Sequence, residues 1–113
     1  MTQEILEGDK IIAEFVDCKI EGDSIKRMSK YYSFPRTMAR TIHIDDLEYH
    51  SSWDWIMPVW YKFRDLKFNE ETASKLHLNY VARLAQGLAY GTIEEFFHNM
   101  QIAIKWHNKT KQQ

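Results

Sequence analysis

Hydrophobic positions in the second half of the chain recur every three or four residues, which is the spacing of one face of an α-helix. The first such stretch begins at Asn69, a good N-cap, and can end at Gly91. The second begins with the capping-box pair Thr92 and Glu95 and runs toward Asn108. Two long helices are therefore predicted. The residues expected on their buried faces are Ala73, Leu76, Tyr80, Leu84 and Leu88, and then Ile93, Phe96, Phe97, Met100 and Ile104.

The first half of the chain carries shorter signals. Asp9 can cap a short helix that ends near Cys18, and turn residues follow it. Residues 30–34 are rich in aromatic side chains, and residues 40–45 alternate polar and apolar side chains, as strands do. A β-hairpin or pair of strands is therefore predicted, with its turn at residues 35–37.

The stretch YHSSWDWIMPVW, residues 49–60, holds three of the four tryptophans and reads as the start of a helix. Asp54 is the expected cap, because Pro58 then falls near the first turn, where few backbone hydrogen bonds are lost. The tryptophans are expected in the core or at its rim, and the alternative is an exposed cluster that binds a partner. They are Trp53, Trp55 and Trp60.

Together these elements predict a single α+β domain over residues 1–113, rich in helix. Three or four helices are expected to pack on a small antiparallel β-hairpin or sheet. The length suits one domain, and the 44% of hydrophobic residues can supply its core. The polar tail, residues 109–113, is expected to fray because it has nothing to bury.

Three runs of the sequence resemble a known group of proteins: DKIIAEFVDCK, YHSSWDWIMP and IKWHNK. The group consists of small, uncharacterised proteins of Bacteroidetes bacteria, their phages and other mobile elements, and the resemblance covers roughly a third of the chain. In the last run Ile104, Lys105, Trp106 and Asn108 match the group, and His107 stands where the group usually has tyrosine. The resemblance brings no catalytic residue with it.

A single cysteine, Cys18, excludes an internal disulfide and a cysteine-cluster metal site, and it fits a reducing compartment. No apolar run approaches the roughly 20 residues that span a bilayer. The first ten residues are acidic where a signal peptide carries positive charge. A cytoplasmic protein without a membrane partner is expected.

Charge is distributed unevenly. Residues 1–23 hold seven acids and two bases, whereas residues 24–44 hold five bases and no acid. Because arginine and lysine contact phosphates and exposed rings stack on bases, this basic, aromatic segment is the candidate binding site for nucleic acid or a partner. The alternative is structural, with the rings buried and the bases solvated. The candidate residues are Lys26, Arg27, Lys30, Tyr31, Tyr32, Arg36 and Arg40.

Patterns for catalysis or metal binding are sparse. Glu95 and His98 have the spacing found in carboxylate-bridged metal bundles, but the second copy that such bundles need is missing from the sequence. His98 and His107 would project from opposite sides of a helix, so they cannot chelate one ion. His50 adjoins Ser51, yet adjacent residues rarely form a hydrogen-bonded dyad. No catalytic residue, metal site or cofactor is therefore expected.

Two functional hypotheses follow. The first is a non-enzymatic small binding protein of phage or mobile-element type that contacts and modulates a host protein. That host protein could be an effector that handles nucleic acid, which makes an inhibitor of a nuclease-based, CRISPR-like defence a specific form of the hypothesis. The alternative is a small accessory protein that binds RNA or DNA through the basic aromatic segment, residues 26–40.

Overall fold

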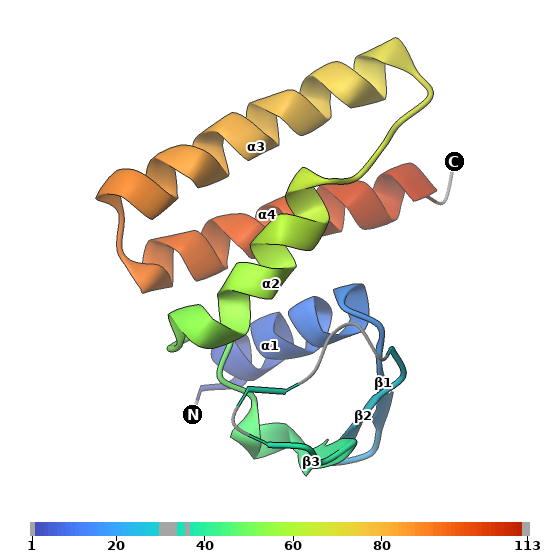
Figure 1. Ribbon diagram of the computed structural model, residues 1–113, viewed down its shortest axis with the longest axis vertical. Helices are drawn as coiled ribbons and strands as arrows, with labels where there is room; N and C mark the ends of the chain where they lie inside the picture. Colours follow the sequence, from blue (N-terminus) through green and yellow to red (C-terminus); the bar gives the residue numbers. More distant parts are fainter. Residues whose placement is uncertain (1, 30–33, 36, 112–113) are drawn as a thin grey trace.

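The computed structural model describes residues 2–29, 34–35 and 37–111 (Figure 1). Over these residues the chain forms four α-helices, one short 3-10 helix and a three-stranded antiparallel sheet, which confirms the predicted helix-rich α+β fold. In chain order the elements are α1 (Gln3–Phe15), β1 (Cys18–Glu21), β2 (Ser24–Arg27), β3 (Thr41–His43), η1 (Ile44–Asp46), α2 (Trp53–Arg64), α3 (Glu71–Tyr90) and α4 (Ile93–Lys111).

Helix α1 begins earlier than the sequence pattern predicted. Thr2 is the N-cap, and its hydroxyl accepts a hydrogen bond from the Ile5 amide at 3.2 Å. The prediction that Asp9 caps the helix is wrong, because Asp9 lies in the middle of α1 and is fully buried. Gly8 lowers the intrinsic helix propensity of α1, but its lack of a side chain allows α1 to cross α4 very closely at this position. A Cβ atom on Gly8 would lie 2.7 Å from Cζ of Phe97.

The β-hairpin is formed by β1 and β2, and its turn lies at Gly22 and Asp23. Gly22 has a φ of +60°, which the first position of a tight two-residue hairpin turn favours. This hairpin lies earlier in the chain than the predicted one, and the predicted turn at residues 35–37 includes Arg36, which lies outside the described part of the chain. The predicted strand at residues 40–45 contains β3, which pairs with β2, while residues 30–33 lie outside the described part of the chain.

Helix α2 has Ser52 at its N-cap position, two residues before the predicted cap, so Pro58 lies inside the helix. Its buried face carries Trp55 and Trp60, as expected for core tryptophans, whereas Trp53 remains 39% exposed.

The two long C-terminal helices agree closely with the sequence pattern. Helix α3 begins after Glu70, one residue later than predicted. Thr92 caps α4 as predicted, because its hydroxyl accepts a hydrogen bond from the Glu95 amide at 3.2 Å. Leu76, expected on the buried face of α3, is instead 41% exposed. Helix α4 continues through Lys111, while residues 112–113 of the predicted tail lie outside the described part of the chain.

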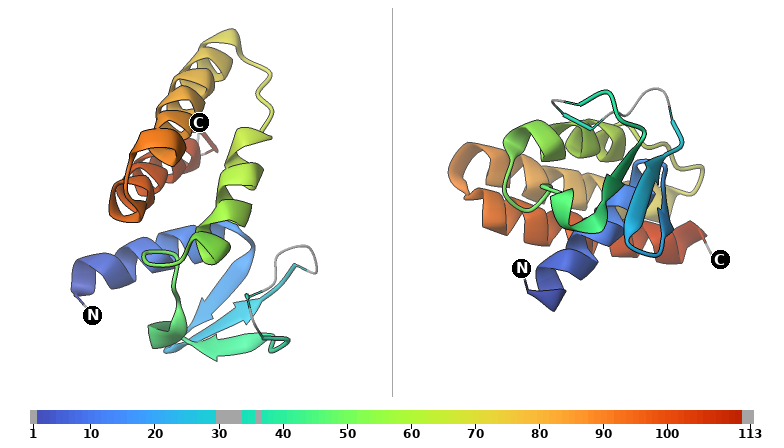
Figure 2. Two further views of the ribbon diagram at one scale, coloured as in Figure 1. Left: turned by 60° about the vertical axis from the view of Figure 1, so that its left-hand side comes forward. Right: turned by 90° about the horizontal axis from the view of Figure 1, so that it is seen from below.

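Helix α4 is the centre of the molecule. In Figure 1 the sheet, α1, α4 and α3 follow one another from bottom to top, and α2 crosses in front of α4. The turned views in Figure 2 show the same order, with the sheet on the far side of α1 from the α3–α4 hairpin. Helices α1 and α4 run in the same direction, because Gly8 lies beside Phe97 and Phe15 meets His107 with ring centroids 5.7 Å apart. Their N-terminal ends are therefore neighbours.

Candidate functional site

The sheet places two of the predicted basic candidates, Lys26 and Arg27, on opposite faces. Lys26 is exposed on the outer face of β2, directly opposite Lys19 of β1. Arg27 is on the inner face, opposite Cys18, because successive side chains of a strand point to opposite faces. Arg40 is exposed, and its carbonyl accepts a hydrogen bond from the Arg27 amide at 2.7 Å. The other four candidates lie outside the described residues: Lys30, Tyr31, Tyr32 and Arg36.

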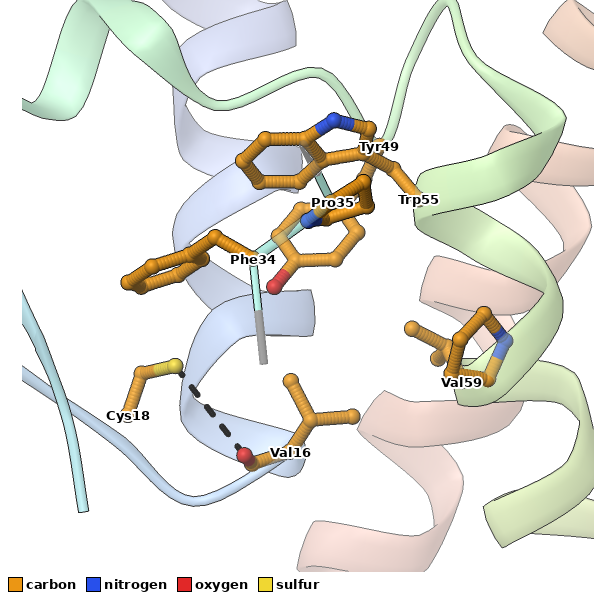
Figure 3. Close-up of a pocket in the computed structure, with 8 residues that line it drawn as sticks. Val16, Cys18, Phe34, Pro35, Tyr49, Trp55 and Val59 are labelled. Atoms are coloured by element: carbon orange, nitrogen blue, oxygen red, sulfur yellow. Dashed lines mark hydrogen bonds between the residues drawn. The ribbon is translucent and has the colours of Figure 1, made fainter. Parts of the chain in front are cut away.

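The end of the aromatic segment is part of the core. Phe34 is buried and stacks on Trp55 with centroids 5.7 Å apart. The two rings surround a gap of about 10 Å³ together with Tyr49 and Cys18 (Figure 3). That volume is close to the space of a single water molecule, so it cannot hold a larger ligand. Burial raises the pKa of the Cys18 thiol to about 11, which keeps the thiol protonated and inert at neutral pH.

A much larger cleft of about 550 Å³ lies between α1 and α4 and reaches the loop before α2. Its apolar wall comes from Ile5 and Ile11 of α1 and from Phe97 of α4. Around this wall stand charged and polar side chains from all three segments. They are Glu4, Glu7, His50, Ser51, Glu94, His98, Gln101 and Lys105.

The depth of this cleft is set where the two helices cross. A Cβ atom on Gly8 would come within 2.6 Å of Nε2 of Gln101, so only glycine lets α1 approach α4 this closely. Phe97 is almost fully buried below that crossing, and its ring meets the His50 ring with centroids 6.0 Å apart. The site is therefore built on two packed helices, which fix its shape.

His50, which lines one side of the cleft, is held from behind by the buried Asp9. Oδ2 of Asp9 lies 2.7 Å from Nδ1 of His50, and this bond ties the middle of α1 to the loop before α2. The Asp9 side chain is completely buried, while that of His50 is 20% exposed. Burial raises the pKa of Asp9 to about 6, and His50 together with the backbone at Tyr49 opposes the shift. Removal of the carboxylate from water disfavours its charged form, and this effect on the pKa is larger than the opposing effect of His50.

Sequence reasoning missed this pair. Its signal was an acidic residue on an apolar helix face, since Asp9 follows Ile5 by four positions and precedes Ile12 by three. Such a carboxylate needs a partner from elsewhere in the chain. The sequence alone does not identify that partner, because His50 lies 41 positions further along the chain and only the tertiary structure brings it close.

The pair has a definite chemical consequence for the cleft. When Asp9 holds Nδ1–H of a neutral His50, the other ring nitrogen is left as a hydrogen-bond acceptor. Ser51 also lines the cleft, but the described hydrogen bonds include none between its hydroxyl and His50. His98 is exposed and His107 buried, on different sides of α4 as expected. Within the described residues, no three His, Cys, Asp or Glu side chains are placed to hold a metal ion.

Comparison of the chain with protein-family models, with curated proteins and with solved structures finds no match. Among the helices of the described residues, none combines the length and the apolar character that crossing a membrane requires.

Proposed function

We propose that this chain is a small non-enzymatic binding protein that contacts another protein through the cleft between α1 and α4. The observation that carries the proposal is the cleft itself. Its volume of about 550 Å³ falls within the range of roughly 300–1,000 Å³ typical of binding pockets. An apolar wall with a charged rim is the usual composition of a site that holds a side chain or short segment of a partner.

The resemblance to small proteins of phages and mobile elements supports a host protein as the partner. A modulator of a host effector that handles nucleic acid, including an inhibitor of a nuclease-based, CRISPR-like defence, is the specific form we propose. Such effectors carry basic surfaces for phosphate contacts, which would be attracted to an acidic rim.

The test is capture of host proteins from a nuclease-treated Bacteroidetes lysate on the immobilised protein. His98→Trp places a large side chain at the cleft from an exposed helix position, so it should abolish capture of the specific partner. Lys109→Trp is the matched control, because Lys109 is exposed on the same helix and does not line the cleft. Capture that survives His98→Trp would refute the proposal.

Nucleic-acid binding remains the alternative, and one observation favours it. Lys19 and Lys26 stand side by side on the exposed outer face of the sheet, with Thr41 next to them on β3. Glu21 of β1 forms an ion pair with Lys19 at 3.4 Å and partly offsets this positive charge. A flat basic sheet surface can follow a phosphate backbone. Loss of capture after nuclease treatment would favour this function.

A further inference from the structure

We infer that the cleft between α1 and α4 receives an arginine side chain of the partner, held by the carboxylates of Glu4, Glu7 and Glu94. The inference rests on the proposed function and names the chemistry of its ligand. An arginine combines an aliphatic stem, which suits the apolar wall of Ile5, Ile11 and Phe97, with a cation that suits the rim.

The balance of charge around the cleft is negative. Three carboxylates line it, and Lys105 is the one lysine or arginine among its lining residues. Glu7 already interacts with Lys10 at 3.5 Å and with the Gln3 amide at 2.8 Å. Glu4 and Glu94 have no ion-pair partner within the described part of the chain. Two carboxylates on this rim are therefore available to an incoming cation.

Helix dipoles give these glutamates a second, purely structural explanation. Glu4 and Glu94 stand in the first turns of α1 and α4, where negative charge is favourable. The two neighbouring helix ends together contribute about one positive charge, roughly half a charge each. Three carboxylates exceed that, so the acidic end of the cleft still attracts a cation, although Lys105 reduces the attraction at the other end.

Arginine suits the cleft better than lysine for a geometric reason. Its planar guanidinium can bind two carboxylates and lie against a ring at the same time, whereas an ammonium is compact and strongly hydrated. The rings of Phe97 and His50 form an aromatic corner inclined at 68° beside the carboxylates. When His50 is neutral and donates Nδ1–H to Asp9, its other ring nitrogen can accept a further hydrogen bond from the guanidinium.

The inference can be tested with blocked peptides on the full chain. The probes are acetyl-(Gly-Arg)3-amide, its lysine counterpart, and a citrulline counterpart that keeps the shape of arginine without the charge. Binding is followed by amide NMR shifts in about 0.15 M salt, where distant surface charges are screened. The arginine peptide should shift signals around Glu4, His50 and Glu94 and bind more tightly than the lysine peptide. The citrulline peptide should not bind.

Site-directed variants separate the cleft from general acidity. The double change Glu4→Gln and Glu94→Gln should weaken binding of the arginine peptide about tenfold, since two charge-assisted contacts are lost. The control pair Asp45→Asn and Asp46→Asn removes two exposed carboxylates from η1 and should leave binding unchanged. The amide spectrum of each variant shows whether its fold is intact.

Equal affinity in both double variants, or equal affinity for the arginine and citrulline peptides, would overturn the inference. Failure of the proposed function is a different outcome. If His98→Trp abolishes partner capture while Glu4→Gln with Glu94→Gln retains it, the binding protein stands and the arginine does not. If His98→Trp leaves capture intact, the proposed function fails whatever the peptides do.

Discussion

Asp9 is a carboxylate inside a hydrophobic core, and within the described residues its side-chain hydrogen-bond partner is Nδ1 of His50 at 2.7 Å. Because the folded state raises its pKa from 3.8 to about 6, the folded state binds this proton more tightly than the unfolded chain does. The contribution of Asp9 to stability is therefore fully present below pH 4 and is lost as the pH rises through 6. At neutral pH the ionised group costs on the order of 3 kcal/mol.

We expect Asp9→Asn to remove this dependence. An amide oxygen can still accept a hydrogen bond from Nδ1–H of His50, and no charge is buried. The variant should be at least as stable as the wild type at pH 8. Its free energy of unfolding should fall by about 2–3 kcal/mol relative to that of the wild type as the pH is lowered to 4. Urea unfolding at several pH values measures the difference. A difference between the two proteins that stays constant from pH 4 to pH 8 would contradict the prediction.

Two glycines inside helices offer a matched test of packing. A Cβ atom on Gly8 would meet Phe97 and Gln101 at 2.6–2.7 Å, so Gly8→Ala should force α1 away from α4 and destabilise by roughly 1–3 kcal/mol. A Cβ atom on Gly87 has its nearest neighbour at 3.5 Å, an ordinary contact. Gly87→Ala should therefore stabilise by up to about 1 kcal/mol through helix propensity. Thermal unfolding of both variants is the measurement, and equal effects would refute the packing argument.

At the scale of elements, the sequence predicted helices best where apolar residues recur at one regular helical spacing. Helices α3 and α4 were found to within three residues at each end, because their apolar spacing and capping residues agree. The start of α1 was missed, since Gly8 and the acidic Asp9 interrupt the pattern, and both are explained only by the contact with α4 and His50.

The sheet shows a different limit of sequence reading. The sequence predicted turn residues after the first helix, but it did not predict that Gly22 and Asp23 form the turn of the β1–β2 hairpin. Strands of three or four residues hold too few alternations to reveal their partners. The cleft was not predicted at all, because it requires the parallel approach of two helices that are far apart in the sequence.

The tryptophans of α2 differ in burial, and this gives an element-scale prediction. Trp60 is 6% exposed and meets Phe96 edge-on at 6.2 Å, so Trp60→Ala should destabilise by roughly 3–5 kcal/mol. Phe97→Ala should have an effect of similar size. Trp53→Ala should cost clearly less, because that ring is already 39% exposed. Chemical denaturation ranks the three variants, and a Trp53 variant as unstable as the Trp60 variant would contradict the ranking.

For the whole molecule, the fold places opposite charges on different surfaces. The parallel arrangement of α1 and α4 puts Glu4 and Glu94 at one acidic cleft, while the outer face of the sheet carries Lys19 and Lys26. The overall net charge of −1 hides this separation. A protein partner with basic side chains would use the cleft, and a nucleic acid would use the sheet.

Salt dependence distinguishes these two surfaces, because binding to phosphates releases condensed counterions and weakens steeply as salt rises. We expect weak or no binding of the wild type to single-stranded RNA or DNA in about 0.15 M salt, measured by fluorescence anisotropy. Reversal of the sheet face with Lys19→Glu and Lys26→Glu should leave partner capture and the fold unchanged, since both side chains are exposed. The wider reversal of Lys30, Arg36 and Arg40 to glutamate tests the rest of the basic segment in the same assay. Tight, salt-sensitive binding by the wild type, abolished by either reversal, would replace the protein-binding function with the nucleic-acid alternative.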